Sequence, residues 1–211
     1  MPTELPDAGR VLDVAAGIVA GGGYDTLTLD GLAKAADVGT AELIELFGSL
    51  DEALVVMLNR EFTAIYLALV DHVERDPRGG LLSRIYYYTL AAVYERPLAK
   101  VLYTADRNAM NAIMRSANSF GYVPGVEIRA ELIERMQNVG MARRDVDAGT
   151  VSRMLAIFSA GLALTAPHDD LDRIVRGVSD LLVQAVDLDV ADTTPGKAAF
   201  YEWAMSLAQS R

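Results

Sequence analysis

The sequence predicts an all-α protein in which three short helices precede one long connecting helix and a bundle of about five or six further helices. Three observations predict this class. Apolar residues recur at helical spacing almost throughout, strand-like alternation is weak, and turn signals stand at helix-length intervals. With 211 residues, 52% of them hydrophobic and 23% charged, the chain can bury a substantial core.

The three short helices are expected near the N-terminus. Residues 10–20 have one apolar face, and the glycines at 21–23 end this helix because glycine accepts the left-handed conformation of a C-cap. Thr28 is the expected N-cap of the second helix, within residues 26–37. The third helix is expected in VGTAELIELFGSL at 38–50.

The long connecting helix is expected over residues 51–74. It starts at a capping box in which Ser49 can accept a hydrogen bond from the amide of Glu52, and Glu52 can reach back to Ser49. It stops at RDPRGG, residues 75–80, because proline and glycine break a helix. No apolar run approaches the roughly 18 residues that span a membrane, so no membrane partner is expected.

The second half of the chain is expected to form the bundle. Asp147 and the Asp pair at 169–170 are the expected N-caps of two long apolar helices. DLDVAD at 187–192 lacks the glycine and distal glutamate of a calcium loop and is predicted to be a solvated loop. The expected bundle helices span residues 81–96, 98–120, 126–139, 151–166, 169–186 and 196–210.

Composition narrows the function. Cysteine is absent, which excludes disulfides, thiolate metal sites and a cysteine nucleophile. His72 and His168 have no metal-ligand partner at helical spacing, and no phosphate loop, dinucleotide fingerprint or nucleophile elbow is present. We therefore expect no metal, no cofactor and no enzyme activity. The first ten residues lack the features of a signal peptide, so a cytoplasmic location is expected.

Two stretches, GYDTLTLDGLAKAADV at 23–38 and LFGSLDEAL at 46–54, resemble the TetR family of bacterial transcriptional regulators. The family has a glycine–aromatic pair, a threonine-rich helix start and an Ala–Gly–Val turn, and its recognition helix ends in Phe before a Ser cap. GMARRDVDAGT at 140–150 resembles the turn before the family's dimer helix. The resemblance covers the whole chain and is specific in the first 55 residues.

The resemblance implies a helix-turn-helix DNA-binding module over residues 1–48, followed by a ligand-binding and dimerisation domain over 49–211 with a connecting helix at 49–75. It implies a homodimeric regulator, with operator DNA and a small apolar or aromatic effector as partners. The positions that it carries over as DNA contacts are Thr28, Lys34, Thr40, Ala41, Glu42, Ile44 and Glu45.

The charge of the predicted module opposes DNA binding. Through Gly48 it has two basic and eight acidic residues, a net charge of −6 in a chain of −10. Phosphate neutralisation supplies much of DNA affinity, and acids on a docking face repel DNA. Thr40 and Ile44 replace the family's usual phosphate-binding lysine and tyrosine, and Asp30 stands where arginine is common. One alternative is therefore a TetR-fold protein that has lost or weakened DNA binding and serves as a ligand-binding or protein-interaction module. A weaker alternative is a small-molecule-modifying enzyme on the same scaffold.

The bundle is also expected to contain the ligand cavity that the resemblance implies. A YYY run, further tyrosines, adaptable methionines and an asparagine could line it, and ordinary core packing is the alternative for each residue. The predicted ligand-binding residues are Tyr87, Tyr88, Tyr94, Tyr103, Met110, Asn111, Met114 and Met136.

The helices expected over 147–166 and 169–187 have broader apolar stripes than one bundle needs to bury. In the family the equivalent pair forms a four-helix dimer interface, which favours a homodimer here over a purely intrachain core. The predicted interface residues are Met154, Phe158, Leu162, Leu171, Val175, Val178 and Leu182.

Overall fold

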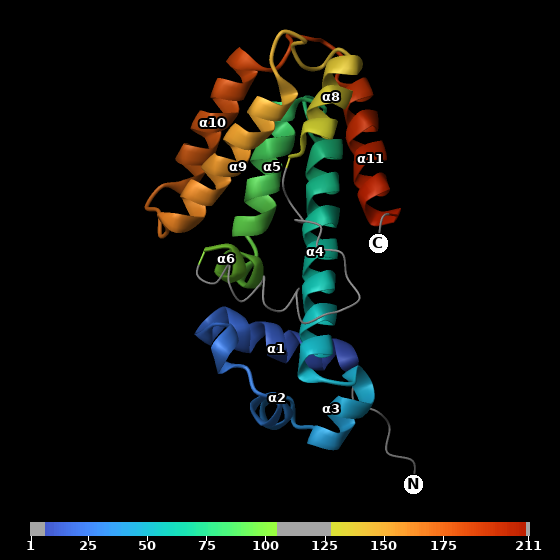
Figure 1. Ribbon diagram of the computed structural model, residues 1–211, viewed down its shortest axis with the longest axis vertical. Coiled ribbons are helices and arrows are strands. Elements are labelled where there is room, and N and C mark those ends of the chain that lie inside the picture. The colour runs from blue at the N-terminus through green and yellow to red at the C-terminus, as the bar shows by residue number, and fades with distance from the viewer. Residues whose placement is uncertain (1–6, 105–127, 210–211) are drawn as a thin grey trace. The chain divides into compact units, whose positions relative to one another are not determined.

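The computed structural model of the chain describes residues 7–104 and 128–209, and within them the secondary structure is helical (Figure 1). The isolated bridge between Ala142 and Asp187 is the one strand-like pairing of the described residues. The predicted all-α class is therefore confirmed. The elements are α1 (Ala8–Gly22), the 3-10 turn η1 (Tyr24–Thr26), α2 (Leu29–Ala36), α3 (Thr40–Phe47), α4 (Leu50–Arg75), α5 (Leu82–Tyr94), α6 (Pro97–Thr104), α8 (Ala130–Asn138), α9 (Ala148–Leu164), α10 (Leu171–Ala185) and α11 (Thr194–Gln209).

The predicted helix starts are confirmed by capping hydrogen bonds. The side-chain oxygens of Thr28, Asp147 and Asp170 accept from backbone amides at the starts of α2, α9 and α10. At α4 the Ser49 hydroxyl accepts from the Glu52 amide at 3.1 Å, as expected. The Glu52 carboxylate reaches back to Ser49, as expected, and accepts from its hydroxyl at 3.4 Å.

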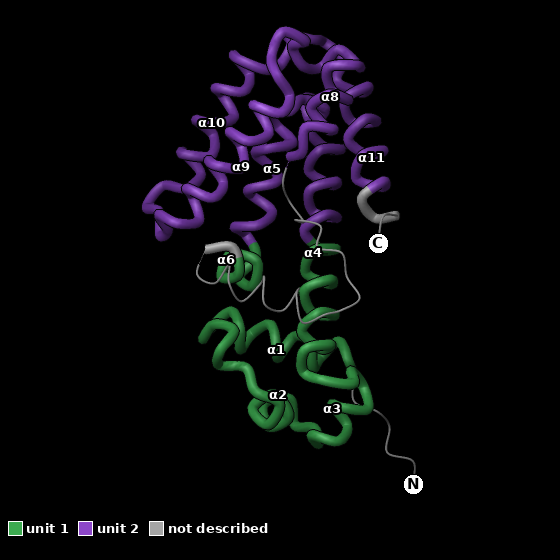
Figure 2. The backbone as a smooth tube through the Cα atoms, viewed as in Figure 1, with its two compact units in different colours: residues 1–64, 96–122 green, residues 65–95, 123–211 purple. Residues whose placement is uncertain are grey.

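The chain divides into two compact units (Figure 2). Unit 1 consists of residues 1–64 and 96–122, and unit 2 of residues 65–95 and 123–211. Because one boundary falls inside α4 and the next lies just after α5, each unit is assembled from two separate stretches of the chain.

Unit 1 packs α1 against α2, η1 and α6, and α2 against α3. Its apolar side chains recur at helical spacing and are buried, among them Val11 on α1, Leu32 on α2 and Leu43 on α3. A two-pronged ion pair ties α4 to the start of α6, because the guanidinium of Arg96 donates to both carboxylate oxygens of Glu61 at 2.8 and 2.7 Å. Such a fork-to-fork geometry is among the stronger arrangements of a paired charge.

Unit 2 is organised around α5, which packs on α10, while α8 packs on both α9 and α11. A buried polar contact links α5 to α9: the hydroxyl of Tyr86 donates to the Leu155 carbonyl at 3.2 Å and lies 2.8 Å from the Ser159 hydroxyl. Burial raises the pKa of Tyr86 to about 12, so this hydroxyl stays protonated and remains a donor. The large side chains buried in this core include Leu82, Ile85, Tyr86, Leu132, Ile133, Met136, Phe200 and Trp203.

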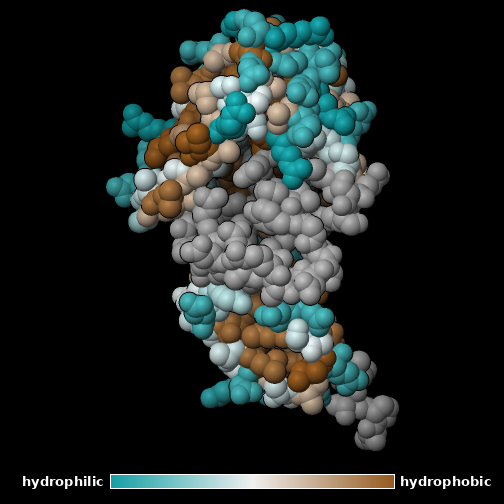
Figure 3. Space-filling model, viewed as in Figure 1, coloured by the Kyte–Doolittle hydropathy of each residue, from teal (hydrophilic) through white to brown (hydrophobic). Residues whose placement is uncertain are grey.

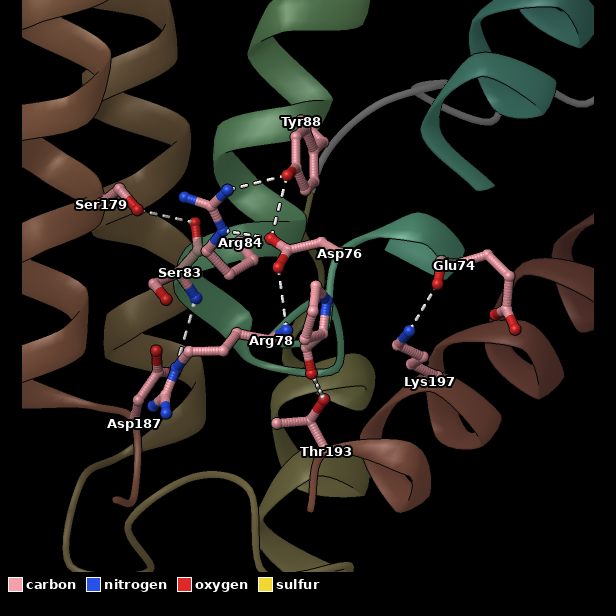
Figure 4. Close-up of polar contacts among 11 residues, drawn as sticks. Glu74, Asp76, Arg78, Ser83, Arg84, Tyr88, Ser179, Asp187, Thr193 and Lys197 are labelled. Carbon is pink, nitrogen blue, oxygen red and sulfur yellow. Dashed lines mark hydrogen bonds and ion pairs between the residues drawn. The ribbon is translucent and has the colours of Figure 1, made fainter. Parts of the chain in front are cut away.

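The first turn of α11 approaches the loop after α4 without side chains between the two backbones. A Cβ atom at Gly196 would overlap the carbonyl oxygen of Gly80 and come within 2.8 Å of the Met141 Cγ. The Lys197 ammonium donates to the Glu74 carbonyl at the end of α4, at 2.6 Å (Figure 4). A cation beside terminal carbonyls also offsets the helix dipole, so this contact fixes both helix ends.

Helix α4 corrects one expectation from the sequence. By length and composition alone it is apolar enough to cross a membrane, contrary to the prediction that no segment is. The core helix of a soluble protein passes the same test, and 44% of its apolar window is buried against the rest of the chain. Glu61 on this helix forms an ion pair with Arg96 at the start of α6, which also fits a packed helix rather than one facing lipid.

Replacement of Gly196 by alanine should destabilise the protein by roughly 1–3 kcal/mol, because the added methyl group must displace the Gly80 backbone. Gly17→Ala is the matched control: Gly17 lies inside α1 with nothing within 4 Å of a Cβ atom. That variant should gain about 0.5–1 kcal/mol from helix propensity. Urea unfolding of both variants measures the difference, and equal midpoints would contradict the close approach.

Candidate functional site

The α2–α3 pair is the first candidate site. Thr28 begins α2 by accepting from the Gly31 amide at 3.1 Å. Asp37 ends the helix in the left-handed conformation, with φ 52°, which Asp tolerates better than most residues. α3 then starts at Thr40 and buries Leu43. The local geometry is that of two short helices joined by a tight turn.

The carboxylate of Glu42 is engaged inside this module. It accepts a hydrogen bond of 2.7 Å from the backbone amide of Gly39, the residue that precedes α3. Glycine has no side chain that can cap a helix, so the glutamate three positions later supplies the acceptor. A negative charge in the first turn is also favoured by the helix dipole. The sequence placed Glu42 among the DNA contacts, and the structure gives it this local structural role.

The exposed face of α3 consists of Ala41, Ile44 and Glu45, with Thr40 half-buried beside them. Ile44 is 48% exposed, although its size and apolarity favour burial. Lys34 is exposed on α2 and is the one basic residue of the α2 and α3 sequences.

Arg10, the other basic residue before Gly48, is engaged within the module. Its guanidinium donates to the Ala36 carbonyl at the end of α2, at 2.6 Å. This cation therefore compensates the C-terminus of α2.

A cavity of about 260 Å³ between α5 and α10 is the second candidate site. Of the predicted ligand residues, Tyr87 and Tyr94 line it. The Tyr87 hydroxyl donates to the Asp172 carboxylate at 2.9 Å, and the Arg176 guanidinium pairs with the same carboxylate at 2.7 Å. The hydrogen bonds from Arg176 and then Tyr87 lower the pKa of Asp172. The lining residues are Tyr87, Leu90, Ala91, Tyr94, Glu95, Leu171, Asp172 and Val175.

The other predicted ligand residues do not line this cavity in the described part of the chain. Met136 is fully buried in the core of unit 2, and Tyr88 belongs to a polar cluster at the start of α5. Three further predicted residues lie outside the described residues: Met110, Asn111 and Met114. The side chain of Tyr103 also lies outside the described part of the chain.

The polar cluster around Asp76 was not predicted from the sequence (Figure 4). The Asp76 carboxylate accepts from the Arg84 guanidinium at 2.6 Å, from the Tyr88 hydroxyl at 2.9 Å and from the Arg78 amide at 2.8 Å. Burial acts to raise the pKa of Asp76, but these hydrogen bonds outweigh it and hold the pKa below its usual value. The sequence signals a turn here, because Asp76 precedes Pro77. It contains no signal that Asp76 would pair with Arg84 and Tyr88 on the next helix.

Asp187 corrects another expectation. The sequence predicted a solvated loop at 187–192, yet Asp187 is only 6% exposed. Its Oδ1 accepts from the backbone amides of Leu82 and Ser83, the first residues of α5, at 3.1 and 3.4 Å. Figure 4 shows the contact with Ser83. Burial raises the pKa of Asp187 above its usual value, although these hydrogen bonds act in the opposite direction. The residue caps a helix that starts 105 positions earlier in the chain.

The α9–α10 pair contains an apolar groove of about 560 Å³. The residues predicted for the dimer interface divide into three groups. Leu162, Val175 and Leu182 are buried within the chain, whereas Met154 is 63% exposed. Phe158, Leu171 and Val178 are half-buried.

Other apolar side chains of α9 and α10 are exposed and were not among the predicted interface residues. In Figure 3, hydrophobic side chains gather over these two helices. Their helical spacing was visible in the sequence, but spacing alone does not tell which side of a two-sided apolar helix packs on its own chain. The exposed residues are Ile157 at 72%, Leu164 at 78%, Ile174 at 39% and Leu181 at 64%.

Comparison with known proteins identifies the fold. No family model and no curated protein matches the chain. Among solved structures, the ketosteroid transcriptional regulator KstR2 of Mycobacterium tuberculosis matches with a TM-score of 0.55 and 16% identity, over 86% of this chain and 95% of that one. A TetR transcriptional regulator from Agrobacterium tumefaciens matches with a TM-score of 0.42 and 18% identity, over 87% and 96%.

The architecture thus belongs to an all-α class with a helix-turn-helix arrangement, α2 and α3, followed by a helical bundle. Within that class, the similarity to KstR2 shows that the chain has the TetR fold that the sequence predicted. At this level of identity the similarity concerns the fold alone. Among the described residues, no group of three or more His, Cys, Asp or Glu side chains is arranged to hold a metal ion.

The Asp187→Asn variant should change how stability depends on pH. The folded-state pKa lies above the ordinary 3.8, so the native state binds more protons than the unfolded chain. The resulting stabilisation is complete below the ordinary pKa and is lost as the pH rises through the raised value. Asparagine retains an acceptor oxygen and carries no charge, so the variant should gain stability relative to wild type as the pH rises above the ordinary pKa of 3.8 and through the raised value. Denaturant unfolding across this range measures the gain, and a pH-independent difference would count against it.

Proposed function

We propose that the protein is a TetR-like transcriptional regulator that binds operator DNA as a homodimer and whose DNA binding responds to a small ligand. The observation that carries this proposal is the α2–α3 pair, in which Thr28 and Glu42 cap the helices and Leu43 is buried. A helix-turn-helix requires such rigidity because its second helix must enter the major groove as one body. We place the protein in the cytoplasm, where bacterial DNA is found.

The exposed side chains of α3 favour apolar contacts with DNA over charged ones. Ala41 and Ile44, with the methyl group of Thr40, are suited to the methyl groups of thymine. Lys34 is the cation that α2 offers to a phosphate, and Glu45 opposes it. We therefore expect weak binding with a shallow salt dependence of about −2 in log–log slope for a dimer, since each phosphate contact contributes about −0.9.

The Glu45→Lys variant should bind operator DNA more tightly and with a steeper salt dependence. The change replaces a repulsive charge with a cation on the exposed face of α3, and each new phosphate contact adds about −0.9 to the slope. Fluorescence anisotropy with DNA from upstream of the protein's own gene measures both quantities. Glu134→Lys, at an exposed position of α8, makes the same change in net charge and should leave the slope unaltered. The proposal fails if the wild-type protein binds no DNA at the lowest salt concentration.

The proposed dimer interface is the exposed apolar surface of α9 and α10. Met154, Ile157 and Leu164 on α9 and Ile174 and Leu181 on α10 are between 39% and 78% exposed in the single chain. Contiguous apolar surface of this kind is rare on monomers and typical of interfaces. A second copy related by two-fold symmetry would cover it with the same pair of helices, giving four helices at the interface.

The Leu181→Asp variant should therefore be monomeric. A carboxylate in the centre of an apolar interface loses hydration without a partner, whereas on a monomer it stays in water. Sedimentation velocity measures the mass. Leu67→Asp is the control, because Leu67 is equally exposed, at 66% against 64%, and lies on α4. A wild-type monomer, or dimers of both variants, would contradict this interface.

A second candidate function is a TetR-fold module that docks a basic protein instead of DNA. It is favoured by the exposed carboxylates Asp30, Asp37 and Glu45 and the exposed side chain of Ile44, which all belong to the α2–α3 segment. Carboxylates around an apolar contact suit a cationic protein surface. The DNA-binding assay separates the two functions, since this module would bind no DNA at low salt and Glu45→Lys would create binding.

A further inference from the structure

The cavity between α5 and α10 has carboxylates on both walls and no basic side chain in its lining. Asp172, on α10, is compensated because it pairs with Arg176 and accepts from Tyr87. Glu95, at the end of α5, has neither an ion pair nor a side-chain hydrogen bond among the described residues. Glu95 is therefore the uncompensated charge of this lining.

The arginines near the cavity are already neutralised. Arg84 is held by Asp76, and Arg176 by Asp172. Their guanidinium carbons lie 5.3 and 5.9 Å from the ring centroid of Tyr87, so that ring is already in contact with two cations. Neither arginine offers a free charge to an anionic ligand.

Tyr94 is the aromatic side chain of the lining that remains for a ligand. It is half-buried, and its hydroxyl makes no hydrogen bond among the described residues. Burial raises its pKa, so the side chain is a neutral phenol at neutral pH and its ring face stays attractive to a cation. Tyr94 and Glu95 are adjacent in sequence and line the same cavity.

The rest of the lining is apolar. Leu90 and Ala91 from α5 and Leu171 and Val175 from α10 form the walls around the tyrosines. The volume of about 260 Å³ lies just below the roughly 300–1,000 Å³ of sites for drug-sized molecules. The cavity thus suits a ligand with a compact apolar body. A positive charge on that ligand would find its counter-charge at Glu95.

We propose that this cavity binds a small organic cation: a compact aryl or alkyl body between α5 and α10, with a protonated amine held by the Glu95 carboxylate and the ring of Tyr94. The proposal rests on the proposed function for its identification of the ligand as an effector. The binding site itself does not depend on DNA. It narrows the effector from any apolar molecule to an amine.

The test compares three probes of matched size on the full chain by isothermal titration calorimetry: 2-phenylethylamine, 2-phenylethanol and 3-phenylpropanoate. A cation–π contact and an exposed ion pair together predict about five- to tenfold tighter binding of the amine than of the alcohol at low salt. The carboxylate probe should bind more weakly than either. The proposal is overturned if the alcohol or the carboxylate binds as tightly as the amine, or if no probe binds.

Two variants test whether the carboxylate of Glu95 holds the amine. Glu95→Gln should weaken amine binding and narrow its advantage over the alcohol to the cation–π contribution of Tyr94, and it should leave alcohol affinity unchanged, because it removes the charge and retains the shape. Glu131→Gln, at an exposed position of α8, is the control and should change neither. Equal loss of both probes would indicate a structural effect and contradict the assigned role.

The DNA-binding assay is performed separately, with and without the amine. Amine binding with no effect on DNA would support the site and contradict its role as an effector site. DNA binding without amine binding would overturn the site and leave the proposed regulator intact.

Discussion

The carboxylate of Asp187 fixes the start of α5, and α5 supplies one wall of the cavity as well as the centre of the unit 2 core. Its hydrogen bonds to the amides of Leu82 and Ser83 hold the segment after α10 against the first turn of α5. The Ser179 hydroxyl reinforces this arrangement by donating to the Ser83 carbonyl at 3.1 Å. The spacing between α5 and α10, and with it the cavity between Tyr87 and Val175, depends on these contacts.

Local signals in the sequence predicted much of the fold. Thr28, Ser49, Asp147 and Asp170 stand next to the amides that they cap, so a short window of sequence contains both partners. Asp187 and its partners are 105 positions apart, and nothing near Asp187 distinguishes a buried cap from a solvated loop. Contacts between distant segments depend on the packed structure, which periodicity and composition do not specify.

The candidate sites were predictable to different degrees. Tyr87 and Tyr94 share a face of α5 seven positions apart, and the structure places both at one cavity, whereas Tyr88, one position on, points to Asp76. The sequence showed the apolar stripe of α9 and α10, but it did not show which side of each helix packs on its own chain. In the structure Leu162 is buried and Leu164 is exposed. The two acidic residues of α3 likewise differ in role, which the sequence did not show. Glu42 caps its own helix, whereas Glu45 remains exposed.

The interleaving of the two units limits how the chain can be dissected. A fragment that ends after α3 contains the helix-turn-helix yet lacks both α6, which packs on α1, and the Glu61–Arg96 ion pair. A fragment that starts after α3 retains unit 2 together with parts of unit 1 that have lost their partners. Neither half can be isolated by a single cut, so insertions, fusions and proteolytic fragments are expected to affect both units together.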